Sequence, residues 1–276
     1  MKLRLGVVFV LLSIVAATAW AVEPKIVKAS YNHFTDEDEQ VIGAKLSAMY
    51  EDKNPVVNSS LLNGYVNKLV AKLGEASQRP SLQYRAKVVD SNEINASSLP
   101  GGYIYVNRGL LEFANNESEL AGVLGHEVGH AAARHSLNVL ARQQVVIDAL
   151  DQARARGIVL TDEMANRIAS QIGGAIWTLI ERANSRDQER EADLLGFYET
   201  LRAGWNPHGG VTFLERLAGF TGEHSIVDRF LSTHPPYAER TSTLVNELKS
   251  VALPNDLIED SMSFKAMKLA LGVVKK

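Results

Sequence analysis

The pentapeptide His-Glu-Val-Gly-His at residues 126–130 sets narrow limits on what this chain can be. Side chains four residues apart lie on the same face of a helix, so His126 and His130 can bind one metal ion together. Glu127 lies roughly 100° further round such a helix, within reach of a water molecule at that ion. The spacing is that of the two-histidine zinc motif, in which the metal polarises water and the glutamate takes its proton. The motif therefore predicts a hydrolytic zinc site.

The residues around this motif predict close packing of the helix against another backbone. Gly122, Gly125 and Gly129 fall within eight positions, and a glycine inside a helix costs ~1 kcal/mol relative to alanine. The simplest reason for three of them is the close approach of a second segment. Two histidines on a helix covered in this way need polar partners or a metal.

A hydrolytic zinc ion takes three protein ligands and keeps one position open. The chain has no cysteine, so the third ligand must be a histidine, an aspartate or a glutamate. Glu189 and Asp193 are four residues apart and share one face of a second predicted helix. The small residues Ala192 and Gly196 beside them let that helix lie against the glycines of the first. We therefore predict that Glu189 is the third ligand and that Asp193 accepts the other ring N–H of His126.

Composition and charge exclude several other classes of protein. The sequence pI is about 6.2 and the formal net charge is −3, so nothing indicates a nucleic-acid partner. The absence of cysteine excludes disulfides and thiolate catalysis. A content of 46% hydrophobic and 22% charged residues is ordinary for a globular protein, and 276 residues suffice for one substantial domain.

The first 21 residues have the three-part layout of a secretory signal peptide. Lys2 and Arg4 form a basic start, an apolar run follows at residues 5–15, and cleavage sites of the small-x-small type end at Ala19 and Ala21. The run is shorter than the ~20 residues that a membrane span needs, so we expect cleavage rather than a retained anchor. The predicted mature chain, residues 22–276, is then a single exported domain without a stable membrane span.

Hydrophobic periodicity predicts an α+β fold that is mostly helical, with a small sheet beside the helix of the metal motif. Thr35 is a predicted N-cap at the start of the first helix. Asn116 or Ser118 is predicted to open the helix of the metal motif, which we expect to run to about Leu140. The other predicted elements are helices at residues 42–50, 62–73, 188–203 and 244–248, a helix that starts at 207, and strands at 83–89 and 103–106.

The two helical motifs together resemble the CAAX prenyl protease and HtpX family of zinc metallopeptidases, and within it the periplasmic BepA-like branch without its helical-repeat domain. The similarity extends over residues 35–248 and is also carried by the segments 95–96, 99–106, 109–111 and 232–235. The resemblance implies a zincin-like fold of the gluzincin type. It also implies one Zn²⁺ per chain, with Glu127 as general base, Asp193 behind the ligands, and three metal ligands: His126, His130 and Glu189.

The resemblance leaves three roles open for His234. In BepA-like proteins the histidine of a His-Pro motif can occupy the open metal position, so His234 is a latch of this kind, a hydrogen-bond donor to the transition state, or a packing residue of a loop. Arg240 follows at the spacing usual in the family, and we expect it on a helix surface. Glu191 is expected to point away from the site and to pair with Arg190 or another charge. The remaining histidines have no partner pattern and are expected to be ordinary polar residues: His33, His135, His208 and His224.

We predict an edge strand beside the zinc helix, to which an extended peptide adds by backbone pairing. Its residues are Tyr103, Ile104, Tyr105 and Val106. Such pairing tolerates many sequences and suits unfolded or misassembled polypeptides. The sequence therefore favours a zinc-dependent endopeptidase of the periplasm that acts on exported envelope proteins. The alternatives are a latched, largely non-proteolytic binding module with a chaperone-like function and, more weakly, a metal-dependent hydrolase such as an amidase. The oligomeric state is left open.

Overall fold

The computed structural model describes residues 34–172, 185–220, 225–234 and 237–274. The predicted signal peptide lies outside these residues. The three strands are β1 (Arg85–Val89), β2 (Ala96–Leu99) and β3 (Tyr103–Asn107). The helices are α1 (Asp36–Lys53), α2 (Ser60–Glu75), the 3₁₀ turn η1 (Pro100–Gly102), α3 (Arg108–Phe113), α4 (Glu117–Ala132), α5 (His135–Leu140), α6 (Gln144–Ala155), α7 (Asp162–Ile172), α9 (Arg186–Arg202), α10 (His208–Ala218), α11 (Ser225–Thr233), α12 (Tyr237–Ser250) and α13 (Met262–Val274).

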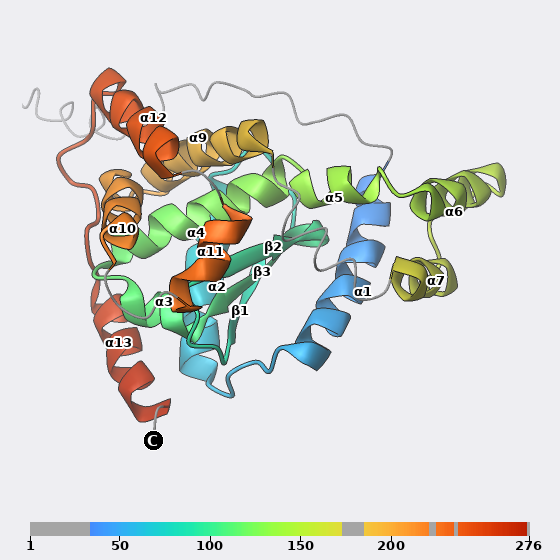
Figure 1. Ribbon diagram of the computed structural model, residues 1–276, viewed down its shortest axis with the longest axis horizontal. Helices are drawn as coiled ribbons and strands as arrows, with labels where there is room; N and C mark the ends of the chain where they lie inside the picture. Colours follow the sequence, from blue (N-terminus) through green and yellow to red (C-terminus); the bar gives the residue numbers. More distant parts are fainter. Residues whose placement is uncertain (1–33, 173–184, 221–224, 235–236, 275–276) are drawn as a thin grey trace, which may run out of the picture.

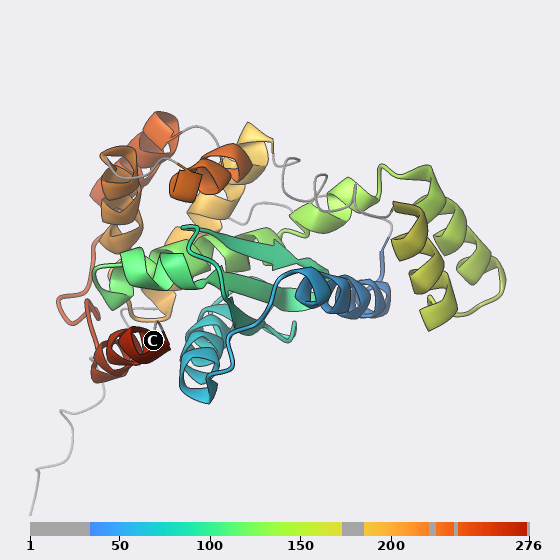
Figure 2. The ribbon, with the colours of Figure 1, turned by 60° about the horizontal axis from the view of Figure 1, so that its bottom comes forward.

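This architecture confirms the predicted α+β class, with many helices around one small sheet. Figure 1 shows α4 running alongside the sheet, with α9, α10 and α12 packed beyond it. In both views α6 and α7 stand apart at one end of the molecule (Figure 2). Within the described residues, no helix combines the length and the apolar character that crossing a bilayer requires.

The sheet has the strand order β1-β3-β2, so β3 is its central strand. It pairs in parallel with β1, where Arg85 lies opposite Tyr103, and antiparallel with β2, where Ala96 lies opposite Val106. The prediction that residues 103–106 form an edge strand is therefore wrong. The physical reason is that each edge of β3 already pairs with a neighbouring strand, so neither edge is left for a peptide. Its two faces are covered as well: Tyr105 packs with Tyr50 of α1, whereas Ile104 belongs to the core that α2 and α4 share.

Side-chain caps fix where two helices begin. Thr35 accepts a hydrogen bond from the backbone N–H of Asp38 at 3.1 Å and donates its own to the Asp38 carboxylate at 3.0 Å, which confirms the predicted start of α1. Asn116 caps α4 by accepting from the N–H of Glu119 at 2.8 Å. Each cap satisfies backbone N–H groups that have no partner within the helix.

Helix α4 ends at Ala132 and does not continue to Leu140 as predicted. Arg134 adopts a left-handed conformation, with φ of 59°, and α5 begins at the next residue. The Arg134 side chain is held by the carboxylate of Glu39 at 3.1 Å and by the carbonyl oxygen of Phe34 at 3.1 Å. These contacts with the start of α1 hold a non-glycine residue in a conformation that it otherwise avoids, and the chain turns at this point.

The glycines of α4 allow α9 and α10 to approach its backbone closely, as predicted for α9. A Cβ atom on Gly125 would lie 2.9 Å from the carbonyl oxygen of Gly196, and one on Gly129 would lie 2.8 Å from that of Ala192. Gly122 instead meets Gly210 of α10, at 2.6 Å from its Cα. Larger side chains at these positions would force the helices apart, so the small residues set the distance between the two helices that carry the site.

Candidate metal centre

Four buried side chains from three segments converge beside the contact of α4 and α9. They are His126 and His130 of α4, Glu189 of α9, and His234 directly after α11, and each offers a donor atom within 4.8 Å of the others. The Nε2 atoms of His126 and His130 are 2.9 Å apart. The Glu189 carboxylate lies 3.3 Å from Nε2 of His130 and 3.5 Å from Nε2 of His126. Two imidazoles and one carboxylate form a donor set that is typical of catalytic zinc.

The carboxylate of Glu127 lies next to these donors, and one of its oxygens accepts no hydrogen bond from the described residues. Its side chain is almost completely buried, and Oε1 lies 3.6 Å from Nε2 of His234. Among the described residues, this oxygen has no hydrogen-bond partner. Buried polar atoms are nearly always paired, so an oxygen left open beside a cluster of metal donors fits a site that takes up a metal and water.

The protonation of two donors suits metal binding. Burial raises the pKa of Glu189, but the neighbouring histidines, His234 first, outweigh this and hold the pKa well below its usual range. Burial and the neighbouring His126 lower the pKa of His130 well below its usual value. Burial and Arg240 lower the pKa of His126, whereas Asp193 and Glu189 raise it, with a result of about 9. Glu189 is therefore ionised and His130 neutral, as ligands must be, whereas His126 has to release a proton when it binds a metal.

Asp193 lies behind His126 and is itself held by Arg240. Oδ1 of Asp193 is 2.9 Å from Nδ1 of His126, the contact that the sequence predicted. Arg240 donates to both oxygens of Asp193, at 2.8 and 2.7 Å, and reaches the Glu189 carboxylate at 3.2 Å. Burial raises the pKa of Asp193, but the charge and hydrogen bonds of Arg240 keep it well below its usual range.

The expectation that Arg240 lies on a helix surface is therefore wrong. Its side chain is only 3% exposed. The first turn of α12 packs against α9, where a guanidinium that binds a carboxylate through two hydrogen bonds compensates the burial of both charges. The short spacing between His234 and Arg240 in the sequence could have indicated that Arg240 belongs to the site, since Arg240 also donates to the His234 carbonyl oxygen at 3.2 Å.

His234 lies against the metal donors rather than apart from them. Its Nδ1 is 3.1 Å from the Glu189 carboxylate and 3.3 Å from Nε2 of His126. Its ring also packs on Phe230, with the ring centroids 4.9 Å apart. The side chain is buried, so it fills space beside the donors.

Two residues that the sequence treated as ordinary also belong to this cluster. His135 is fully buried, and its Nδ1 lies 2.7 Å from Nδ1 of His130. Glu191 contacts Nε2 of His135 at 3.3 Å. The expectation that Glu191 points away from the site, to pair with Arg190 or another charge, is therefore wrong as to its direction, and Arg190 reaches Asp187 and Glu239 instead. Of the other histidines, His33 and His224 lie outside the described residues, and His208 is exposed.

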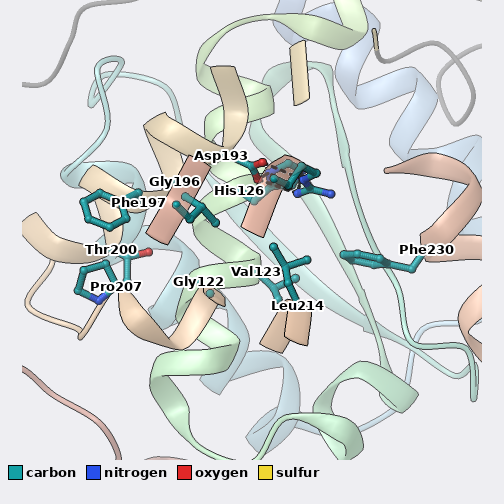
Figure 3. Close-up of a pocket in the computed structure, with 13 residues that line it drawn as sticks. Gly122, Val123, His126, Asp193, Gly196, Phe197, Thr200, Pro207, Leu214 and Phe230 are labelled. Atoms are coloured by element: carbon teal, nitrogen blue, oxygen red, sulfur yellow. Dashed lines mark hydrogen bonds and ion pairs between the residues drawn. The ribbon is translucent and has the colours of Figure 1, made fainter. Parts of the chain in front are cut away.

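A small pocket adjoins His126, with a lining drawn mostly from α4, α9 and α10. Its volume is about 30 Å³, and Figure 3 shows His126 and Asp193 together at one end, above Val123 and Leu214. The remaining lining combines small residues with apolar side chains, such as Phe230. A space of this size holds about one water molecule.

A helix with two histidines and a glutamate, packed on a second helix that presents a carboxylate, defines the zincin-like class of metallopeptidases. Comparison of the sequence with known families supports this classification. The profile of peptidase family M48 matches residues 60–248, and the chain belongs to this family. The match spans α2 to α12 and thus includes every residue of the cluster described above.

Several curated relatives carry the names of metalloproteases or proteases. Metalloprotease YcaL of Escherichia coli strain K12 is 29% identical over 218 residues, which are 78% of this chain and 82% of that protein. The beta-barrel assembly-enhancing protease of Yersinia pestis is 30% identical over 70% of this chain and 40% of its own length. The mitochondrial metalloendopeptidase OMA1 of Arabidopsis thaliana is 31% identical over 61% of this chain and 32% of its own length. The chain thus spans less than half of the latter two relatives.

Proposed function

We propose that this chain is a zinc-dependent endopeptidase in which His126, His130 and Glu189 hold the metal. The observation that carries the proposal is the convergence of these donors within 4.8 Å, from two helices that small residues hold together. The chemistry of the donors favours zinc over magnesium or calcium, which prefer oxygen ligands. Membership of peptidase family M48 supports hydrolysis of peptide bonds rather than of other amides.

The role proposed for each residue follows from its position relative to the metal donors. Bound zinc supplies a Lewis acid that polarises the scissile carbonyl and lowers the pKa of water. Glu127, whose Oε1 is unpartnered among the described residues, accepts the proton of the attacking water and passes it to the leaving nitrogen. Asp193 accepts the Nδ1–H of His126 and so keeps Nε2 free for the metal, while Arg240 keeps Asp193 ionised.

We propose that an extended peptide pairs with β2, which is an edge strand of the described sheet and lies against α4 (Figure 1). Backbone pairing depends little on the side chains of the peptide. The substrates proposed here are unfolded or misassembled envelope proteins, and the proposed location is the periplasm. The signal-like start of the sequence and the similarity to proteins named beta-barrel assembly-enhancing proteases support both points.

A second candidate function rests on His234. Its Nδ1 lies as close to Glu189 and His126 as they lie to each other, so it is placed to take the position that water needs. A chain latched in this way would bind unfolded envelope proteins and rarely cleave them. The two functions differ in what happens when the imidazole of His234 is removed.

The test compares the parent chain with His234→Ala for zinc content and casein cleavage. One zinc per chain in both proteins and faster cleavage by the variant would establish a latched protease. Equal zinc with lost cleavage would make His234 a hydrogen-bond donor in catalysis. Equal zinc and unchanged cleavage would leave it a packing residue. Absence of zinc from both proteins would refute the proposed function.

A further inference from the structure

Each ligand histidine makes a second contact through Nδ1, but the two contacts differ. Nδ1 of His126 meets the carboxylate of Asp193 directly, at 2.9 Å. Nδ1 of His130 meets a second imidazole instead, that of His135, at 2.7 Å. The far nitrogen of His135, Nε2, faces the carboxylate of Glu191 at 3.3 Å. Both ligand histidines are thus connected to a carboxylate of α9, one directly and one through an intervening ring.

The proton positions along this chain of contacts are fixed by the chemistry of the rings. His130 presents Nε2 to the other donors, so as a neutral ligand it carries its proton on Nδ1. Nδ1 of His135 must then accept that proton's hydrogen bond, which leaves the His135 proton on Nε2. This N–H donates to Oε2 of Glu191. A single arrangement of hydrogens thus pairs both nitrogens of His135 and Oε2 of Glu191, whereas Oε1 of Glu191 is buried without a hydrogen-bond partner among the described residues.

The fold places His135 by an unusual turn. An uninterrupted helix would rotate a residue five positions after His130 by roughly 140° from it, away from its ring. The left-handed conformation of Arg134 breaks the helix one residue earlier and brings His135 back to His130. The side chain of His135 is fully buried there, and its neighbour Glu191 is 12% exposed. Burying a polar ring and a carboxylate costs free energy that an apolar pair would not.

We propose that His135 and Glu191 are positioning residues for the metal ligand His130. Through the hydrogen bonds described above, they hold its ring in the binding orientation and its proton on Nδ1. The negative charge of Glu191 polarises the His135 ring, and the hydrogen bond from His130 to that ring in turn makes Nε2 of His130 a stronger electron-pair donor to the metal. This inference rests on the proposed function, because it assumes that His130 binds zinc.

The first test compares two substitutions of His135 with side chains of similar size, only one of which can accept a hydrogen bond from His130. Asn at position 135 offers an amide oxygen near the place of Nδ1 and can still accept from His130, whereas Leu offers none. The dissociation constant for zinc, from competition with a chelator, is expected to rise about 10- to 100-fold in His135→Leu and less in His135→Asn. His208→Asn, the same change at an exposed histidine of α10, is the control and is expected to match the parent.

The second test examines the charge of Glu191. Glu191→Gln keeps an oxygen that accepts from His135 but removes the charge, so its zinc dissociation constant is expected to lie between those of the parent and of His135→Leu. Titration with Co²⁺ gives a signature that a merely structural role would not change. The visible bands of the bound ion are expected to shift in His135→Leu and Glu191→Gln and to stay in place in His208→Asn.

Three outcomes separate the possibilities. Parent-like zinc affinity and Co²⁺ bands in folded His135→Leu would overturn the positioning role while leaving the proposed function intact. If His135→Leu does not fold, the milder His135→Asn and Glu191→Gln decide, and parent-like behaviour of both overturns the role. A parent chain that binds no zinc would refute the proposed function and this role together.

Discussion

Glu127 is buried beside His234, and one of its carboxylate oxygens has no hydrogen-bond partner in the described part of the chain. It is not among the grouped donors, so Glu127→Gln is expected to leave zinc binding unchanged. The amide cannot take a proton from water, and casein cleavage is expected to fall by about 10²- to 10⁴-fold. Metal analysis and a cleavage assay on the same preparation measure the two effects. Cleavage at the parent rate would show that another group is the base.

Glu199 of α9 gives rise to a pH dependence of stability. It is fully buried, and burial raises its pKa to about 8, against a smaller opposing effect of Arg202 and His126. Between the ordinary glutamate pKa of 4.5 and this value, the folded state holds a proton that the unfolded state has released. Glu199 therefore lowers the free energy of unfolding as the pH rises through this window. Glu199→Gln is expected to be more stable than the parent at pH 8, by a margin that shrinks toward pH 5.

Urea unfolding of both proteins across this pH range measures the effect. Glu37→Gln, the same change at an exposed position of α1, is the matched control and is expected to follow the parent. If the parent and Glu199→Gln lose stability equally between pH 5 and pH 8, Glu199 is not the group responsible.

At the scale of elements, the distance between α4 and α9 depends on residues without side chains. A Cβ atom on Gly196 would lie 2.5 Å from the backbone nitrogen of His126, so Gly196→Ala must push the helices apart. We expect a loss of about 1–3 kcal/mol in the free energy of unfolding and weaker zinc binding, because Glu189 moves with α9. Gly64→Ala in α2 is the control: its new Cβ meets no atom within 4 Å, and it is expected to gain up to ~1 kcal/mol.

Urea unfolding and zinc competition on both variants test this reasoning. A Gly196→Ala protein as stable as Gly64→Ala, with parent-like zinc affinity, would show that α4 and α9 adjust without cost.

Local signals account for what the sequence predicted correctly about these elements. The caps of Thr35 and Asn116 bind backbone groups three residues away, so neither needs the rest of the fold. The same holds for the spacing of His126 and His130, which brings their Nε2 atoms within 2.9 Å. The absence of cysteine then restricted the third donor to few residue types, and the structure brings Glu189 to both rings.

Distant contacts account for what the sequence could not predict. The end of α4 depends on Arg134, whose conformation is held from the start of α1, about a hundred residues earlier in the chain. Burial of Arg240 requires Asp193 on another helix. The central place of β3 depends on which strands pair, although its nearly continuous apolar run is typical of a strand covered on both faces.

In the whole molecule, no single element holds the site. The four candidate donors come from α4, α9 and the residue after α11, which the chain separates by up to 108 positions. Such a site does not exist in the unfolded chain, so metal binding and folding are linked. The family match likewise begins at α2 and ends in α12. It has to be this long because the residues of the site are spread over these elements.

The linkage makes zinc removal a quantitative test of the whole arrangement. A ligand that binds only the folded state stabilises it by about 4 kcal/mol when its free concentration is 1,000 times its dissociation constant. Urea unfolding at buffered free zinc is therefore expected to show this gain, and EDTA is expected to abolish it. Glu127→Gln should gain as much as the parent, because its ligands are intact, whereas Glu189→Gln should gain much less. An unfolding midpoint that does not respond to zinc in the parent would mean that the folded chain has no zinc site to lose.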